Sequence, residues 1–330
     1  MVEDFLNGLE DCTLCEWRCG VDRLEGELGV CMLEEPRVAS ATLHPAPPQS
    51  YTVFMTGCNF RCLNCQNWEI AHYPVQDTSV RGYVEPKELA EEAVSKIRST
   101  RGRMIGADRI FFSGGSPTPS LPYIEEVVKE ARKIDDEVKV NYDTNGFMTE
   151  SSLKRVLEFT SSLTFDIKAY RDEVHRALTG APVEPVLRNA EYVAKNAKDK
   201  LWEFRYLLIP GVNDEDVSEL AEFLASIDED IPLNFLAFRP NFVLEEYRGA
   251  RDEDMERAVR RAEKIGLKNV SWSGKTGLPG RGLVEEKVCE VDSLKKIADM
   301  IGCSSRPRNC GSCSNFEFCP IKNYSARRRS

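Results

Sequence analysis

The sequence predicts an α/β fold, a partial (β/α)6 TIM-like barrel with cysteine-rich N- and C-terminal extensions. Strand-like and helix-like segments alternate between residues 51 and 238, and repeated units of this length are typical of a parallel sheet with helices outside it. Six strands are too few to close an eight-stranded barrel. None of the twelve cysteines lies between Cys65 and Cys289, so they cluster toward the ends of the chain.

Short apolar runs predict the strands, which are expected at residues 51–55, 109–113, 138–142, 163–167, 202–209 and 233–238. Apolar residues at helical spacing predict the helices, which are expected at residues 86–100, 121–134, 151–159, 185–197, 214–226, 252–265 and 292–301. Pro86 suits the first turn of its helix, because its missing N–H has no partner there in any case.

Three regions follow from this pattern. Residues 1–49 form a cysteine-rich metal-binding segment, and residues 50–240 form the partial barrel. Residues 241–330 form an extension that carries an auxiliary metal or iron–sulfur site. A chain of 330 residues is long enough to bury a full core in such an arrangement.

Composition narrows the classes of function. The net charge of −10 argues against a general nucleic-acid binder. No apolar run is long enough to span a membrane, and the first residues lack the pattern of a signal peptide. We therefore expect a cytoplasmic protein, in which disulfides are rare. Closely spaced cysteines in that setting indicate metal sites, against the alternative of structural thiols.

The loop after the first barrel strand carries the most specific motif. Cys58, Cys62 and Cys65 have the spacing C-x3-C-x2-C. Three thiolates can hold three irons of a [4Fe–4S] cluster and leave the fourth iron without a protein ligand. An open iron can bind a cofactor or substrate, whereas a cluster with four cysteines normally only passes electrons. This loop is the candidate catalytic centre.

Two further cysteine groups flank the barrel. Four thiols near the N-terminus are spaced x2, x3 and x11, and they suit zinc, a single iron or a closed cluster equally well: Cys12, Cys15, Cys19 and Cys31. Four more follow near the C-terminus, where Cys289 could add another: Cys303, Cys310, Cys313 and Cys319. A purely structural metal is as good an interpretation of the first group, whereas an iron–sulfur cluster is favoured for the second.

Polar residues and glycines follow the predicted strands, where barrels bind their ligands. Gly-Gly alone is more often a plain turn, and a lone lysine is more often a surface residue. Acids and arginines at neighbouring strand ends nevertheless suit a charged ligand, because arginine pairs bidentately with carboxylates. The candidates are Gly114, Gly115, Ser116, Asp143, Thr144, Asp166, Lys168, Arg205 and Arg239.

These motifs, in this order, resemble the radical S-adenosylmethionine (SAM) superfamily, and within it the activating enzymes of glycyl-radical enzymes. The resemblance covers roughly residues 50–240, and includes His175 to Gly180 and Arg205 to Asp214. Uncharacterised relatives that share the N-terminal four-cysteine motif look closer still. The C-terminal cysteines resemble the auxiliary-cluster (SPASM-type) extensions of radical SAM enzymes that modify peptides and proteins.

The resemblance implies roles for the strand-end residues. Gly114, Gly115 and Ser116 match the motif that binds the SAM amino group, although Ser116 replaces its usual glutamate. Lys168 and Arg205 match positions that contact SAM. In the family, a monovalent cation binds beside the SAM carboxylate at positions that correspond to Asp143, Thr144 and Asp166. Arg239 stands where the family has a histidine.

The leading hypothesis is therefore a radical SAM enzyme that cleaves SAM reductively to a 5′-deoxyadenosyl radical. Its expected substrate is a protein or peptide residue, and the outcome could be glycyl-radical activation, methylation or another modification. Ferredoxin or flavodoxin is the expected type of reductant, and cobalamin stays open as a methyl donor. Two alternatives remain: an iron–sulfur carrier or metal-stapled binding module without radical chemistry, supported by Asn64 and Ser116, and a radical SAM enzyme for a small molecule.

Overall fold

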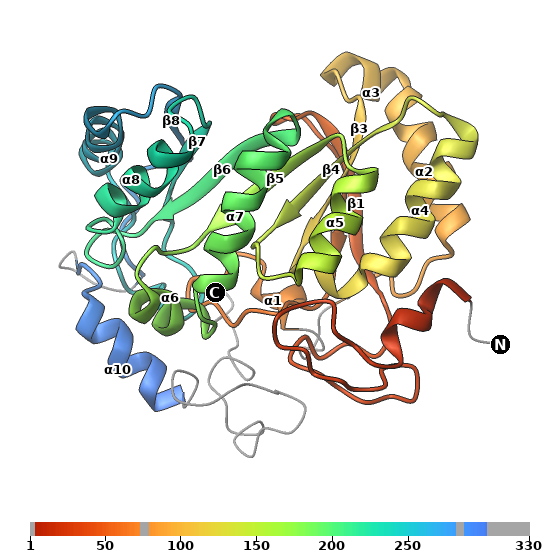
Figure 1. The fold of residues 1–330 in the computed structure, drawn as a ribbon, viewed down its shortest axis with the longest axis horizontal. Helices are drawn as coiled ribbons and strands as arrows, with labels where there is room; N and C mark the ends of the chain where they lie inside the picture. The colour runs from red at the N-terminus through yellow and green to blue at the C-terminus, as the bar shows by residue number, and fades with distance from the viewer. Residues whose placement is uncertain (1–3, 73–78, 282–286, 302–330) are drawn as a thin grey trace. The chain divides into compact units, whose positions relative to one another are not determined.

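The computed structural model describes residues 4–72, 79–281 and 287–301 (Figure 1). The chain has two compact units, which are treated separately below. The first includes residues 4–59 and 67–164, and the second includes residues 60–66 and the described residues from 165 onward. The three region limits expected from the sequence remain a prediction.

The first unit contains strands that follow one another in chain order: β1 (Val38–His44), β2 (Ser50–Met55), β3 (Arg109–Gly114), β4 (Lys139–Thr144) and the first half of β5 (Ser162–Ile167). β1 is antiparallel to β2, whereas β2, β3 and β4 are parallel. Met55 pairs with Gly114, so β2 and β3 end level with each other. This register places the loop after β2 beside the glycines after β3.

Helices of the first unit lie along its strands, as Figure 1 shows for α2, α4 and α5. Ser99 caps α3 by accepting a hydrogen bond from the Gly102 N–H, and Thr149 caps α5 through the Ser152 N–H. The helices of the unit are η1 (Asp4–Leu9), α1 (Trp68–Ala71), α2 (Pro86–Arg98), α3 (Thr100–Ile105), η2 (Thr118–Ser120), α4 (Leu121–Ile134) and α5 (Glu150–Phe159).

The second unit continues the same pattern with the end of β5, β6 (Leu201–Leu208), β7 (Leu233–Ala237) and β8 (Val270–Ser273). β6, β7 and β8 are parallel. Its helices are α6 (Asp172–Thr179), α7 (Glu184–Asn196), η3 (Lys198–Lys200), α8 (Val217–Ile227), η4 (Phe242–Leu244), α9 (Asp252–Ile265) and α10 (Val291–Ile301). Gly180 ends α6 in the left-handed conformation, with φ 83°, which favours glycine.

The predicted α/β class is confirmed, and β2 to β7 are the six predicted strands. The sequence pattern missed β1, β8, α1, α3 and α6. After Val38 and Ala39, β1 alternates only between half-buried and exposed positions, so it lacks the apolar run of a core strand. β8 has only four residues and buries no side chain fully, so it lacks the apolar run of a core strand.

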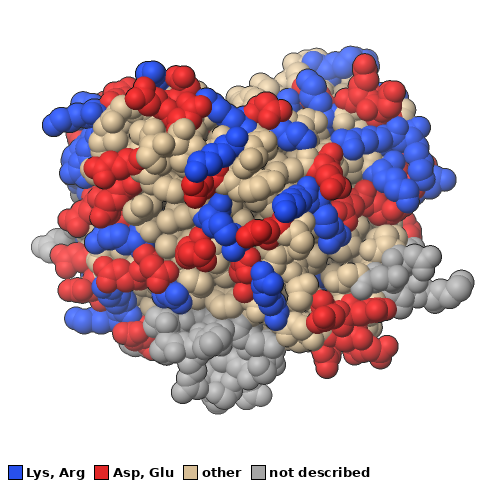
Figure 2. Space-filling model, viewed as in Figure 1, with Lys and Arg blue, Asp and Glu red and all other residues tan. Residues whose placement is uncertain are grey.

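Charged side chains of both signs are interspersed on the face of the molecule shown in Figure 2. Mixed charges of this kind produce no large field of one sign. None of the helices in the described part of the chain is long and apolar enough to cross a bilayer.

Candidate functional site

The three-cysteine loop begins with a glycine whose backbone conformation and surroundings favour glycine. Gly57 has φ 74°, and a Cβ there would lie 2.4 Å from the Leu33 side chain. Cys58 is buried, whereas Cys62 and Cys65 are half-buried, and none of the three forms a disulfide. Their role as metal ligands stays a prediction of the C-x3-C-x2-C spacing.

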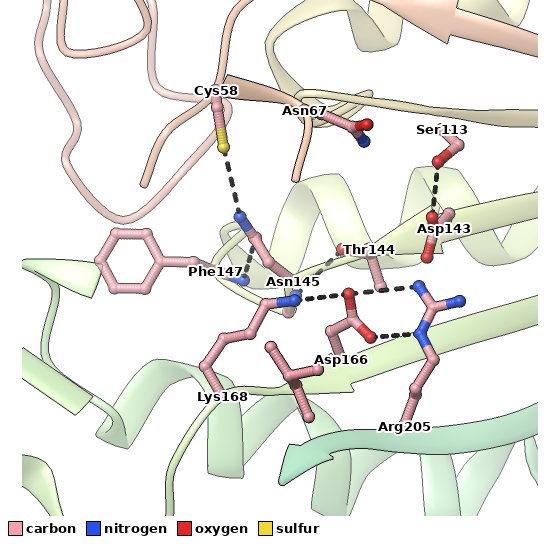
Figure 3. A network of polar contacts seen from close by, with 12 residues as sticks. Cys58, Asn67, Ser113, Asp143, Thr144, Asn145, Phe147, Asp166, Lys168 and Arg205 are labelled. Carbon is pink, nitrogen blue, oxygen red and sulfur yellow. Dashed lines mark hydrogen bonds and ion pairs between the residues drawn. The ribbon is translucent and has the colours of Figure 1, made fainter. Parts of the chain in front are cut away.

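In the first unit, Asn145 joins the end of β4 to the start of this loop (Figure 3). Its Nδ2 donates to Asn59 Oδ1 at 2.7 Å and lies 4.0 Å from Cys58 Sγ. The turn around it is fixed by the Gly146 N–H on Thr144 Oγ1 and by the Phe147 N–H on Asn145 Oδ1. Asn145 is not among the site residues that the sequence predicts. Its position directly after a strand end was the available signal.

The glycine pair after β3 packs against the backbone of the same loop. The Gly115 N–H donates to Met55 O at 2.9 Å, and the Ser116 N–H donates to Gly57 O at 2.9 Å. A Cβ on Gly115 would lie 2.0 Å from Gly57 O, so this close approach requires glycine. Asn67 Nδ2 also donates to Gly114 O at 2.7 Å. These glycines therefore hold the cysteine loop, in addition to any contact with a ligand.

One acidic side chain in the first unit lies at the carboxyl end of β4. The Ser113 hydroxyl donates to Asp143 Oδ2 at 2.6 Å (Figure 3). Ser113 lies near the carboxyl end of β3 and Asp143 near that of β4, and these two strands are parallel neighbours. Ser116 is buried, and its hydroxyl has no hydrogen-bond partner among the described residues.

In the second unit, one carboxylate binds two cations. Asp166 Oδ2 lies 2.7 Å from Lys168 Nζ, and Asp166 Oδ1 lies 2.6 Å from Arg205 Nε (Figure 3). Burial alone would raise the pKa of Asp166, but the charges of Arg205 and Lys168 outweigh it and hold that pKa well below its usual range. Burial disfavours the charged ammonium of Lys168, yet Asp166 raises the pKa of Lys168 above its usual value. The three groups carry a net charge of +1.

Arg239 is exposed and lies just beyond β7. Two residues further on, Asn241 contacts the cysteine loop, because its Nδ2 donates to Cys65 O at 2.5 Å. Asn241 is not among the site residues that the sequence predicts.

The C-terminal end of α6 holds the middle of the loop in the second unit. The Arg61 N–H donates to Thr179 O at 2.8 Å, and the Leu63 N–H donates to Leu178 O at 2.9 Å. His175 on the same helix is fully buried, with its ring 5.4 Å from that of Phe60. Burial lowers the pKa of His175 to about 4, so the imidazole is neutral at pH 7.

The N-terminal cysteines gather in the first unit. All four line one cavity, which they share with Arg23 and Pro119: Cys12, Cys15, Cys19 and Cys31. Burial raises the pKa of Cys15 well above its usual value, and the neighbouring thiols raise it further. Within the described ranges, no three His, Cys, Asp or Glu side chains already form a set of metal ligands.

Cys289 belongs to neither of these groups in sequence. Cys289 is buried in the second unit, and burial raises its pKa to about 11. The C-terminal cysteines of the predicted auxiliary site lie outside the described residues: Cys303, Cys310, Cys313 and Cys319.

Comparison with known proteins identifies a family for residues 52–224. The profile of the radical SAM superfamily matches residues 52–224, which is more than half of the chain. An uncharacterised protein of Methanocaldococcus jannaschii is 26% identical over 280 residues, covering 81% of this chain and 78% of that protein.

A pyruvate formate-lyase-activating enzyme of Staphylococcus epidermidis is 28% identical over 194 residues, covering 55% of this chain and 71% of the enzyme. Among solved structures, a domain of a pyruvate-formate lyase-activating enzyme from Bacteroides vulgatus matches with a TM-score of 0.42 and 23% identity. That match covers 51% of this chain and 100% of the domain.

Proposed function

Because the chain belongs to the radical SAM superfamily, we propose that it cleaves SAM at a [4Fe–4S] cluster on Cys58, Cys62 and Cys65 and modifies a protein or peptide. The cluster, when bound, supplies the electron that converts SAM to methionine and a 5′-deoxyadenosyl radical. The observation that carries this proposal is the three-thiol loop itself, which offers one ligand fewer than a four-cysteine electron-transfer cluster needs.

The residues around the loop fit this cofactor pair. Asn145 places an amide N–H near Cys58 Sγ, and hydrogen bonds to cluster sulfurs are one means by which proteins adjust cluster potentials. The Gly114–Gly115 pair and Asn67 keep the loop backbone in place, so the thiols have little freedom to move. A rigid ligand set of this kind is what a metal cluster requires.

The charged group of the second unit suits the carboxylate of SAM. Asp166 holds Lys168 and Arg205 together, and the net positive charge favours an anionic ligand group. Asp166 already binds two cationic side chains, so a monovalent cation would have to displace one of them. Asp143 and Thr144 of the first unit remain the other expected cation ligands.

A protein or peptide substrate is supported by the relatives that are named as activating enzymes of pyruvate formate-lyase. The match to one of those relatives spans 55% of this chain. We therefore extend the proposal only to the class of substrate and leave the modified residue unnamed.

Anaerobic incubation of the reduced, cluster-loaded protein with SAM tests the first half of the proposal. We expect 5′-deoxyadenosine and methionine in equal amounts, and their absence would refute radical chemistry and support an electron carrier. Labelled SAM in extract of the source cells tests the second half. Label or a SAM-dependent mass change on a protein supports the proposal, whereas change only in metabolites indicates a small-molecule substrate.

A further inference from the structure

Four thiols and one guanidinium surround a very small cavity in the first unit. The cavity measures about 10 Å³ and is lined by Arg23 together with Cys12, Cys15, Cys19 and Cys31. A space of that size holds about one water-sized particle. A single metal ion at the centre of four thiolates needs no more room than this.

Arg23 makes this cavity unusual. It is 1% exposed, and it donates to two backbone carbonyls, Leu33 O at 2.7 Å and Pro119 O at 2.6 Å. Its Nη1 also lies 4.0 Å from Cys12 Sγ, and its Nη2 has no partner among the described residues. The bonds that the structure gives Arg23 include no carboxylate. Burying a cation without an opposite charge is strongly unfavourable, so this position calls for an anion.

We propose that Cys12, Cys15, Cys19 and Cys31 bind one divalent metal ion as four thiolates, and that Arg23 neutralises part of the resulting charge. Binding releases four protons, and an ion of charge +2 with four thiolates carries a net charge of −2. The guanidinium beside Cys12 reduces that to −1. Both zinc and ferrous iron accept a tetrahedral set of four thiolates.

The side chains must rotate to reach such a geometry. Among the described residues the thiols do not yet form a ligand set, so they must turn toward the centre of the cavity. Gly29 leaves space beside one of them, since a Cβ there would lie 3.1 Å from Cys19 Sγ. All four cysteines already line the same cavity, so their thiols start close to one another.

The metal would also fix a segment that touches the three-cysteine loop. Trp17 lies between two of the cysteines, and its Nε1–H donates to Asn59 O at 2.7 Å. The same segment pairs with the chain after β4, through the Glu16 N–H on Phe147 O and the Thr149 N–H on Leu14 O. The proposed site therefore acts as a clamp on the start of the loop that carries Cys58.

Metal analysis of the full-length protein tests the ligand set. Wild-type protein and the variant Cys15→Ser/Cys31→Ser are purified anaerobically after supply of either Zn²⁺ or Fe²⁺, and metal and sulfide are counted per chain. We expect the variant to lose one metal ion per chain and no sulfide. Loss of iron together with sulfide would overturn the single-ion proposal in favour of a cluster, and unchanged metal content would overturn the site.

Arg23→Met tests the charge argument. We expect Zn²⁺ to be removed by a competing chelator at about tenfold lower concentration, because the thiolates lose their counter-charge. The substitution also removes the hydrogen bonds to Leu33 O and Pro119 O, so Arg23→Lys, which keeps the positive charge, should hold Zn²⁺ more firmly than Arg23→Met. Arg132→Met, which removes another arginine that donates to a backbone carbonyl, should leave Zn²⁺ retention unchanged. Unchanged Zn²⁺ retention in Arg23→Met, or equal retention in Arg23→Lys and Arg23→Met, would overturn the role of Arg23.

Discussion

The four-cysteine cavity and the three-cysteine loop offer metals two very different environments. The cavity surrounds its thiols with a buried arginine and backbone, and its four ligands would complete a tetrahedral site. The loop offers three thiols and is held by amide side chains, among them Asn145 and Asn241. One thiol fewer leaves a metal position open for chemistry, so the number of ligands separates a structural site from a reactive one.

The largest expected effect comes from the loop. Cys62→Ser removes one of three ligands, and we expect the rate of 5′-deoxyadenosine formation to fall about 1,000-fold or more. Ser226→Ala, which removes an exposed hydroxyl on α8, is the control and should keep the rate of the wild type. Product formation by Cys62→Ser within tenfold of wild type would show that the loop is not the reactive centre.

The stability of the helix that holds the loop should depend on pH. The pKa of His175 is about 4 in the folded protein, against 6.5 for an ordinary histidine. Between these values the unfolded chain binds a proton that the folded chain does not. The free energy of unfolding therefore falls as the pH drops from 6.5 to 4, by roughly 3 kcal/mol in total. Above pH 6.5 the contribution of His175 no longer changes with pH.

Urea denaturation of wild type and His175→Gln at pH 7 and pH 5 measures this contribution. The variant should be less stable at pH 7 but should lose less stability than wild type between the two values. Equal losses in both proteins would mean that other groups cause the acid sensitivity.

A smaller effect is expected at the charged group of the second unit. Arg205→Ala leaves Asp166 with Lys168 alone and removes a cation from the proposed SAM site. We expect SAM binding, measured by isothermal titration, to weaken about 30-fold, or about 2 kcal/mol. Arg155→Ala serves as the matched control, because Arg155 also donates two hydrogen bonds to one carboxylate, that of Glu125. Equal SAM affinity in both variants would exclude Arg205 from the SAM site.

The smallest effect should come from the contact between the four-cysteine segment and the loop. Trp17→Phe keeps an aromatic ring on Phe147 but loses the hydrogen bond to Asn59 O. We expect a loss of about 1 kcal/mol in the free energy of unfolding and an altered electron paramagnetic resonance spectrum of the reduced loop cluster. An unchanged spectrum would show that the clamp does not reach the cluster ligands.

Local patterns in the sequence were sufficient for the α/β class, and they also predict the loop ligands. Cys58, Cys62 and Cys65 lie within eight residues, so their spacing alone limits how far apart their thiols can be. The apolar runs of β2 to β7 likewise depend on neighbouring residues, and these strands were predicted close to their observed limits. β1 and β8 were missed because their exposure pattern is set by the elements that pack on them.

The surroundings of the thiols were decided only by the tertiary structure. Asn145 reaches Cys58 from 87 residues along the chain, and Arg23 donates to Pro119 from 96 residues away. Arg205 on β6 binds Asp166 on β5 from 39 residues along the chain. Such contacts depend on how distant segments pack, and no residue spacing encodes them. The sequence by itself thus determined which atoms could bind metal, whereas the fold decided which charges and amides lie beside them.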